Sequence, residues 1–298
     1  TSMWATVRSD RKGLRPGARV SVDAIRRCGT CDACRRGLEN HCRHADYSRG
    51  GFATSLAAPA ANVYPLHDST PLLHAALVEP IACILRAQNR LALPAGATAL
   101  VFGCGPLGLL HLQVLRRHGV RVLASDPVAH RRETALALGA AAALDPAATD
   151  LDEAVAELTG GWGVEAAIVA TGAVDAARQA LPLLAFDGKL VLFAGIHPKA
   201  ALALDPNDVH YRESWITGSS DYTRAEFRQS LSLVEEGSLQ LGTLITDVFP
   251  LADIATAMAA VRSGERLKVM VRCSEVAEPA APRGEGVTAR SPINQRQP

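Results

Sequence analysis

Four of the seven cysteines lie close enough in the sequence to bind one metal ion together. They follow the pattern Cys28-x2-Cys31-x2-Cys34-x7-Cys42. Four thiolates at about 2.3 Å suit tetrahedral Zn²⁺, and a site closed by four protein ligands leaves no position for a reacting molecule. The spacing therefore predicts a structural zinc site with Cys28, Cys31, Cys34 and Cys42 as its ligands.

Two other interpretations of this cluster carry less weight. The bacterial iron–sulfur pattern ends in C-x3-C-P, whereas here the last gap is longer and Arg43 replaces the proline. A nucleic-acid-binding zinc finger would suit the neighbouring basic residues, but these can simply offset the charge of four thiolates. The formal net charge is only +1, so we expect no nucleic-acid partner. The basic residues concerned are Arg26, Arg27, Arg35, Arg36 and Arg43.

A glycine-rich loop has the pattern of a site that binds a pyrophosphate group. A buried-strand pattern, Ala97–Phe102, runs directly into G-x-G-x-x-G, and a helix pattern follows to His118. In this context the first glycine permits a tight turn, the second lets a pyrophosphate approach, and the third lets helix and strand pack closely. The helix also directs free N–H groups and its positive dipole end at the phosphates. The predicted cofactor-binding residues of the loop are Gly103, Gly105, Pro106, Leu107 and Gly108.

An acidic residue stands where such a loop needs one. Asp126 follows the strand pattern Arg121–Ala124, about 20 residues beyond Gly105. Its carboxylate would accept hydrogen bonds from the adenosine ribose and repel a 2′-phosphate, which favours NAD over NADP. Asp126 could instead be only a helix cap. Arg131 and Arg132 could face a 2′-phosphate, so NADP remains the less favoured cofactor.

The rest of the chain predicts an α/β fold. Strand patterns alternate with helix patterns from Ala97 to Ala194, which is typical of βαβ units and a parallel sheet. The segments on either side suggest a mainly β domain into which this Rossmann-type domain is inserted. The expected strands are Ala18–Ala24, one after Gly50–Ala53, Ala140–Leu144, Val164–Ala170, Lys189–Ala194 and Leu267–Arg272. The expected helices are Pro71–Leu93, one ending at Leu138, Asp152–Leu158 and Val174–Leu184. The composition of residues 274–298 predicts a disordered tail.

This combination resembles the zinc-containing medium-chain alcohol dehydrogenase family. The resemblance implies a GroES-like catalytic domain over residues 1–83, a Rossmann NAD-binding domain over 84–218, and a return to the catalytic domain over 219–273. It also implies a second, catalytic zinc ion in the cleft. The motifs that carry it are Leu14–Gly17, the cysteine run, Gly50–Ala53, Glu79-Pro80, Gly103–Gly108 and Ala170–Gly172.

Two segments resemble the polyol and sugar branch of that family, which includes sorbitol and threonine dehydrogenases. They are Glu79-Pro80 and His210–Glu213. By this resemblance Glu79 is a catalytic zinc ligand, Arg212 lines the substrate pocket, and Arg131 and Thr171 lie at the cofactor. The implied reaction transfers a hydride between a polyol, sugar or secondary alcohol and NAD. Glu79 as a helix-start acid and Arg212 as a surface charge remain the alternatives.

The chain departs from the family pattern at the catalytic zinc. The family takes a cysteine and a Gly-His-Glu histidine from upstream of the Leu14–Gly17 turn, and neither motif is present here. Nothing in the sequence places His41, His44, His67 or His74 beside Glu79. The chain is therefore expected to lack the first part of its catalytic domain. The alternative function is a catalytically impaired member that binds NAD and structural zinc. A quinone-reductase-type activity is less favoured, because that branch lacks the cysteine lobe.

The composition of the chain indicates that it folds into a globular protein that does not span a membrane. The chain is 48% hydrophobic and 20% charged, which suffices for a buried core. It contains no apolar run of the roughly 18 residues that a membrane span requires, and no secretory signal pattern. We therefore expect a cytoplasmic protein without a membrane partner, acting on a small-molecule alcohol or polyol. The resemblance further implies a homodimer or homotetramer.

Overall fold

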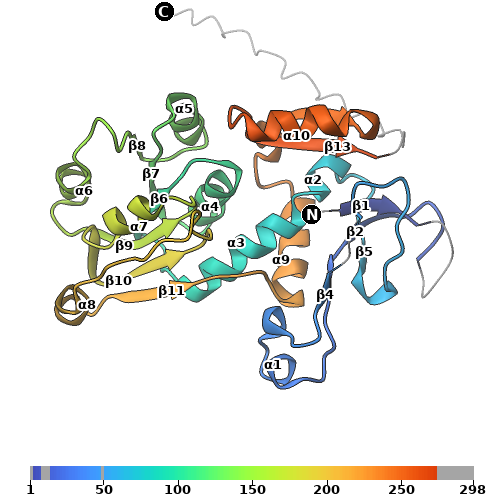
Figure 1. Cartoon of the computed structure of the whole chain (residues 1–298), viewed down its shortest axis with the longest axis horizontal. Helices are drawn as coiled ribbons and strands as arrows, with labels where there is room; N and C mark the ends of the chain where they lie inside the picture. Colours follow the sequence, from blue (N-terminus) through green and yellow to red (C-terminus); the bar gives the residue numbers. More distant parts are fainter. Residues whose placement is uncertain (1–2, 8–13, 48–49, 274–298) are drawn as a thin grey trace, which may run out of the picture.

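The computed structural model describes residues 3–7, 14–47 and 50–273. Its larger part is a six-stranded sheet with the strand order β11-β10-β9-β6-β7-β8 (Figure 1). Every strand pair in it is parallel, so the predicted α/β architecture is confirmed. The strands are β6 (Thr98–Phe102), β7 (Arg121–Ser125), β8 (Ala142–Leu144), β9 (Val164–Val169), β10 (Leu184–Leu192) and β11 (Trp215–Gly218).

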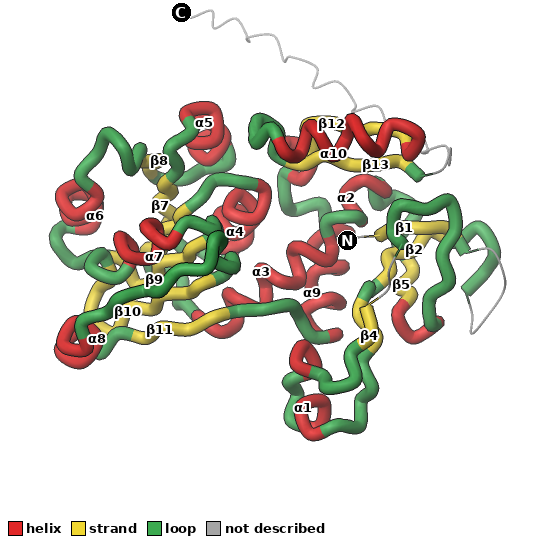
Figure 2. The backbone as a smooth tube through the Cα atoms, viewed as in Figure 1, coloured by secondary structure: helices red, strands yellow, loops and turns green. Residues whose placement is uncertain are grey.

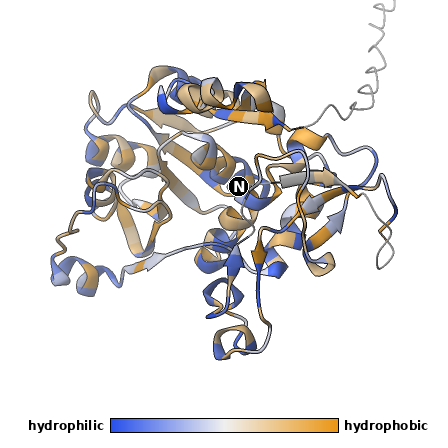
Figure 3. Ribbon diagram, turned by 45° about the vertical axis from the view of Figure 1, so that its right-hand side comes forward, coloured by the Kyte–Doolittle hydropathy of each residue, from blue (hydrophilic) through white to orange (hydrophobic). Residues whose placement is uncertain are grey.

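The two faces of the sheet pack into separate hydrophobic cores. Alternate side chains of a strand point to opposite faces, and β6 shows this directly. Ala99 and Val101 join the core formed with α3 (Val78–Leu91) and α4 (Pro106–Arg117). Leu100 and Phe102 join the core formed with α6 (Leu151–Thr159) and α7 (Val174–Ala180). Figure 3 shows hydrophobic residues in the strands and in the helices that cover them. The helices of this part are α4 (Pro106–Arg117), α5 (Ala129–Ala137), α6 (Leu151–Thr159), α7 (Val174–Ala180) and α8 (Pro206–Arg212).

The second part combines short β-strands with the longer helices α3 (Val78–Leu91), α9 (Arg224–Glu235) and α10 (Ile254–Arg262) (Figure 2). An antiparallel sheet has the order β1-β2-β5, β3 pairs with β4, and β12 pairs with β13 in parallel. The strands are β1 (Met3–Thr6), β2 (Arg19–Val22), β3 (Ile25–Arg26), β4 (Asp46–Tyr47), β5 (Val63–Pro65), β12 (Ile245–Pro250) and β13 (Lys268–Arg272). The helices are α1 (Asp32–Arg35), η1 (Glu39–His41), η2 (Ala60–Asn62), α2 (Leu72–Ala75), α3 (Val78–Leu91), α9 (Arg224–Glu235), η3 (Leu241–Leu244), η4 (Leu251–Asp253) and α10 (Ile254–Arg262).

Proline accounts for two corrections to the expected helices. The helix predicted over Pro71–Leu93 is two helices, α2 and α3, because Pro80 has no N–H and its ring would clash with the carbonyl of residue 76 in one continuous helix. The helix predicted to reach Leu184 ends at Ala180, because Pro182 has no N–H with which to continue the helical hydrogen bonds. Strand β10 consequently begins before the predicted Lys189.

The strand expected after Gly50–Ala53 is wrong. That segment forms bends and an irregular loop, and the next strand is β5. The predicted tail, residues 274–298, lies outside the described residues. Within the ranges that the structure describes, no helix has both the length and the hydropathy needed to cross a lipid bilayer.

Candidate dinucleotide and metal sites

The glycine-rich loop joins β6 to α4 at the carboxyl edge of the parallel sheet. Gly103 has a φ of 94°, in the left-handed region, and its N–H donates to Ser125 O at 2.7 Å. A Cβ on Gly108 would lie 1.8 Å from Gly103 O, so helix and turn approach too closely for any side chain. A Cβ on Gly105 would meet nothing within 4 Å. The loop therefore leaves open space at Gly105, in front of the first turn of α4, where Pro106 and Leu107 begin the helix.

Asp126 lies directly against this loop. Its side chain is almost fully buried, and Oδ2 accepts the Cys104 N–H at 2.7 Å while Oδ1 accepts the Val128 N–H at 2.8 Å. The second bond closes a turn just before α5. The N-cap of α5 is Val128, and no side chain caps this helix, so the interpretation of Asp126 as its cap is wrong. The first bond fixes the carboxylate beside the glycine loop, which is where the ribose interpretation requires it. Carboxylate oxygens each have two acceptor positions, so both bonds are compatible with ribose contacts.

Both arginines that follow Asp126 are already engaged. Arg131 donates to Gly264 O and places Nη1 4.0 Å from Asp126 Oδ2. Arg132 donates to Asp126 O at 2.8 Å and forms an ion pair with Asp145 at 3.0 Å. Asp145 directly follows β8, so it lies at the same edge of the sheet. Both guanidinium groups are thus already bound by acceptors within the protein.

Thr171 is also brought to this edge. A Cβ on Gly103 would lie 3.2 Å from Thr171 Cβ, so Thr171, which follows β9, lies beside the loop. The neighbouring Gly172 O accepts the His197 N–H at 3.2 Å. The exposed His197 was not singled out from the sequence. Its position just after the strand pattern Lys189–Ala194 was the available signal.

The four predicted cysteine ligands converge. Their Sγ atoms all lie within 4.8 Å of one another, with 3.6 Å between Cys28 and Cys42 and 4.0 Å between Cys31 and Cys42. Four sulfurs bound to one zinc ion lie about 3.8 Å apart, so the cage fits this metal. It is carried by residues 27–47, which we call the four-cysteine lobe.

The pKa values of the thiols differ within the cage. The N–H groups of Thr30 and Cys31 donate to Cys28 Sγ and lower the pKa of this thiol to about 5. Burial raises the pKa of the Cys34 thiol to about 12. Some sulfurs of the cage are thus prepared as thiolates and others resist ionisation, and a bound cation would ionise all four.

Glu79 does not lie in a comparable cluster. It occupies the first turn of α3, where Cys83 Sγ is 3.9 Å from its Oε1. Burial lowers the pKa of Lys268, and the negative charge of Glu79 opposes that shift. Within the part of the chain that the structure describes, the four cysteines are the one group of three or more potential metal ligands. These residues do not provide the three protein ligands of a catalytic zinc site around Glu79.

Arg212, which the family resemblance assigns to the substrate pocket, lies at the amino end of β10. Its guanidinium donates to Pro182 O at 2.7 Å and to Leu184 O at 2.9 Å, at the amino end of β10. In a parallel sheet this edge is opposite the carboxyl ends that carry Gly103 and Asp126. Two carbonyls at the start of the strand therefore hold Arg212 away from the cofactor edge.

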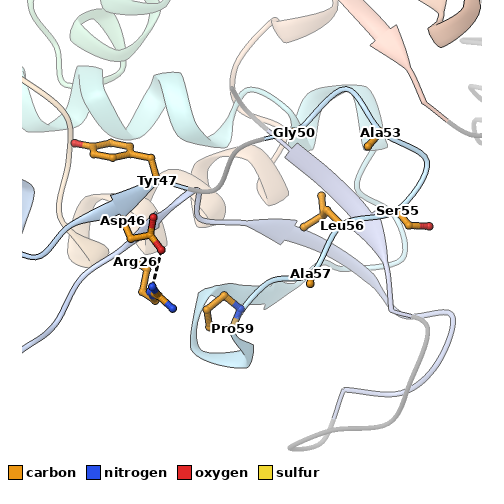
Figure 4. A pocket seen from close by; sticks show the side chains of 9 residues that line it. All are labelled: Arg26, Asp46, Tyr47, Gly50, Ala53, Ser55, Leu56, Ala57 and Pro59. Atoms are coloured by element: carbon orange, nitrogen blue, oxygen red, sulfur yellow. Dashed lines mark hydrogen bonds and ion pairs between the residues drawn. The ribbon is translucent and has the colours of Figure 1, made fainter.

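A pocket of about 660 Å³ lies elsewhere, between the β3–β4 hairpin and the loop that follows it (Figure 4). The Arg26–Asp46 ion pair, 2.5 Å long and mostly exposed, stands at one side. Leu56 and Pro59 form part of the opposite side. None of the sequence-predicted site residues lines this pocket.

Comparisons with known proteins agree with this geometry. The alcohol dehydrogenase GroES-like domain family matches residues 5–68, and the zinc-binding dehydrogenase family matches residues 106–236. The sorbitol dehydrogenase of Halalkalibacterium halodurans is 30% identical over 268 residues, covering 87% of this chain and 77% of the relative. The chain belongs to the zinc-binding alcohol dehydrogenase family. It is a member of the polyol branch, and its fold and its enzyme class, an NAD(P)-dependent alcohol or polyol dehydrogenase, follow from that membership.

Other family members match over similar lengths. The L-galactonate-5-dehydrogenase of Escherichia coli is 31% identical over 246 residues, covering 81% of this chain and 72% of the relative. A zinc-binding dehydrogenase of Sinorhizobium meliloti, solved with NADP bound, is 27% identical with a TM-score of 0.85, covering 90% of this chain and 81% of that one. The 2R,3R-butanediol dehydrogenase of Bacillus subtilis is 30% identical with a TM-score of 0.79, covering 88% and 76%.

Proposed function

We propose that this chain binds NAD at the carboxyl edge of its parallel sheet and transfers a hydride between an alcohol and that cofactor. The observation that carries the proposal is the open space at Gly105 beside the uncapped first turn of α4, with Asp126 fixed next to it. The amides of that turn would hold a diphosphate, and the carboxylate would accept the ribose hydroxyls. NAD, when bound, supplies the hydride acceptor.

The proposed substrate is a polyol, sugar or secondary alcohol. Relatives named for sorbitol, L-galactonate and 2R,3R-butanediol support this class. We assign no reaction step to a second zinc ion, because the described residues form no group of three or more potential ligands that includes Glu79. Zinc in the four-cysteine lobe would cross-link that lobe and take no part in the reaction.

The engaged arginines support NAD over NADP. A 2′-phosphate would have to displace Gly264 O from Arg131 or Asp145 from Arg132. It would also approach the carboxylate of Asp126, and like charges repel. NAD meets neither obstacle, because its ribose hydroxyls can donate to that carboxylate.

A Gly105→Ala variant tests the cofactor site. The added methyl group meets no protein atom, so the melting temperature should stay unchanged. It would occupy the space proposed for the diphosphate, so calorimetric titration should show NAD binding weakened by about tenfold or more. Gly218→Ala is the matched control, because Gly218 ends β11 at the same edge of the sheet and its added Cβ meets only Leu192 O at 3.8 Å. Unchanged NAD affinity in Gly105→Ala would exclude the loop as the diphosphate site.

One observation favours a second candidate function, an NAD- and zinc-binding protein without hydride transfer. The described ranges hold a single potential metal cluster, the four cysteines. Metal analysis and a polyol panel, read as NADH absorbance at 340 nm, separate the two functions. Turnover in the purified chain supports the dehydrogenase. One zinc per chain together with tight NAD binding and no turnover supports the second function.

A homodimer or homotetramer and a cytoplasmic location complete the proposal. Exposed aromatic side chains support self-association, since such residues are enriched in interfaces. Trp162, Phe186 and Trp215 are 56%, 63% and 61% exposed. The Trp162 and Phe186 rings lie 6.1 Å apart, and Trp215 Nε1 donates to Asp187 at 2.8 Å. Light scattering after size-exclusion chromatography should show more than one chain per particle, and Trp215→Ser should lower that number.

A further inference from the structure

The connection between β11 and α9 lies against the four-cysteine lobe. Residues 219–223, which we call the joint, lead from the last strand of the parallel sheet to the lower end of α9 (Figure 1). Three residues of the lobe donate to three successive residues of the joint. Asn40 Nδ2 donates to Ser220 O at 3.0 Å, Tyr47 OH to Asp221 Oδ2 at 2.8 Å, and Arg27 Nη2 to Tyr222 O at 2.7 Å.

The first residue of α9 continues this contact. Glu39 accepts from the backbone N–H of Arg224 at 3.0 Å and from its Nη1 at 2.8 Å. Arg224 Nη2 in turn donates to Arg27 O at 3.0 Å. The joint is thus tied to the lobe along its length, and the ties use backbone groups as well as side chains.

The centre of this contact is fully buried. The Arg27–Asp23 ion pair, 2.6 Å long, has both side chains 0% exposed. Tyr222 is also 0% exposed, donates to Asp23 Oδ1 at 2.9 Å, and has its ring centroid 5.0 Å from the Arg27 guanidinium carbon. Buried ion pairs tolerate little displacement, because each partner depends on the other to offset its desolvation.

The four-cysteine lobe has little apolar core of its own. Its buried residues are Arg27, Asn40 and Cys42. Helix α1 buries no residue and Leu38 is 40% exposed. A segment without an apolar core requires a cross-link, and here a metal ion in the thiolate cage would supply it.

We infer that metal in the four-cysteine lobe acts as the anchor of the joint and so fixes the chain path between the cofactor-binding sheet and α9. Asp221 has a φ of 53°, an unfavourable conformation that neighbouring contacts must maintain. Helix α9 packs on α3, and α3 packs on α4, the helix that opens at the glycine loop. The lobe therefore acts at a distance from the reaction by fixing how the two parts of the molecule meet.

Hydrogen exchange on the intact protein tests this inference. Zinc removal by a chelator should accelerate amide exchange over residues 219–224 on the order of tenfold or more. Exchange in β6 and β9 should stay unchanged, and returning zinc should restore the protection of the joint. Unchanged exchange in the joint would overturn the inference. Equal acceleration in β6 and β9 would overturn it too, because the metal would then stabilise the whole fold.

A Tyr47→Phe variant provides a second test that leaves the thiolates intact. It removes one tie to Asp221, so exchange should increase in the joint while metal analysis shows zinc retained. Tyr211→Phe is the matched control, since Tyr211 is 73% exposed on α8, away from the joint. Identical exchange in Tyr47→Phe and the unmodified protein, with zinc retained, would overturn the inference. Neither readout involves cofactor or alcohol, so these results are independent of the proposed reaction.

Discussion

His111 should make the stability of this protein fall as the pH drops below about 6.5. Its imidazole is 0% exposed in α4, where Gln88 Nε2 lies 3.3 Å from Nδ1 and the Phe193 ring meets it edge-on. Burial lowers the pKa of this imidazole from 6.5 to about 3. The unfolded chain therefore takes up a proton between pH 6.5 and 3 that the folded protein does not, and stability present above pH 6.5 is lost as the pH falls.

The size of this effect follows from the two pKa values. Between pH 8 and pH 5 the proton uptake of the unfolded chain lowers the free energy of unfolding by about 2 kcal/mol. A His111→Gln variant has no titrating group at this position, so this part of the loss should vanish. The measurement is urea unfolding followed by circular dichroism at pH 8 and pH 5 for both proteins. Metal loss from the thiolates at pH 5 affects both proteins alike, so their difference isolates His111.

His118→Gln is the matched control for this prediction. His118 caps the same helix but is exposed, so its replacement should leave the pH dependence of the unmodified protein in place. If His111→Gln loses as much stability between pH 8 and pH 5 as the unmodified protein does, the reasoning from burial is refuted.

Three further substitutions test the site. Asp145→Ala removes the ion-pair partner of Arg132, so direct titration should show NADP affinity rising roughly tenfold relative to NAD; an unchanged ratio would argue against the role given to this pair. Gly108→Ala forces a methyl group against Gly103 O, so thermal unfolding should show destabilisation by about 3 kcal/mol, and NAD binding should weaken. A melting temperature equal to that of the unmodified protein would contradict the close approach of helix and turn. Arg212→Ala loses two bonds to carbonyls and should cost about 1 kcal/mol of stability with NAD affinity unchanged, whereas a specific loss of turnover would return this residue to the active site.

The cofactor edge could be predicted from the sequence because its signals are local. The strand pattern before Gly103 and the acid after the next strand are both read within one βαβ unit. Thr171 was assigned to the cofactor by resemblance, and the parallel pairing of β6 and β9 brings it to the same edge. The cysteine cage was equally readable, since all four ligands occur within one short segment.

Long-range contacts could not be read in this way. Arg212 was assigned to a pocket by resemblance, but its partners are the carbonyls of Pro182 and Leu184, which only the packing of α8 brings within reach. The contact between Arg27 and Tyr222 joins positions 195 residues apart. Neither residue carries a sequence signal for the other. The split between α2 and α3 did have a local cause in Pro80, and the helical periodicity of the flanking residues concealed it.

The strand order also has a consequence for synthesis on the ribosome. β6 is the first strand of the parallel sheet to be made, and it lies in the interior of that sheet, between β7 and β9. After β8 has left the ribosome, β6 can pair only with β7. Its other edge stays unpaired until β9 (Val164–Val169) has been synthesised. That edge carries Ala99–Phe102, all buried in the finished protein. A nascent chain that pauses after β8 and before β9 thus exposes a hydrophobic strand with unpaired backbone groups. At this stage of synthesis, translation speed and chaperones would most affect the yield of folded protein.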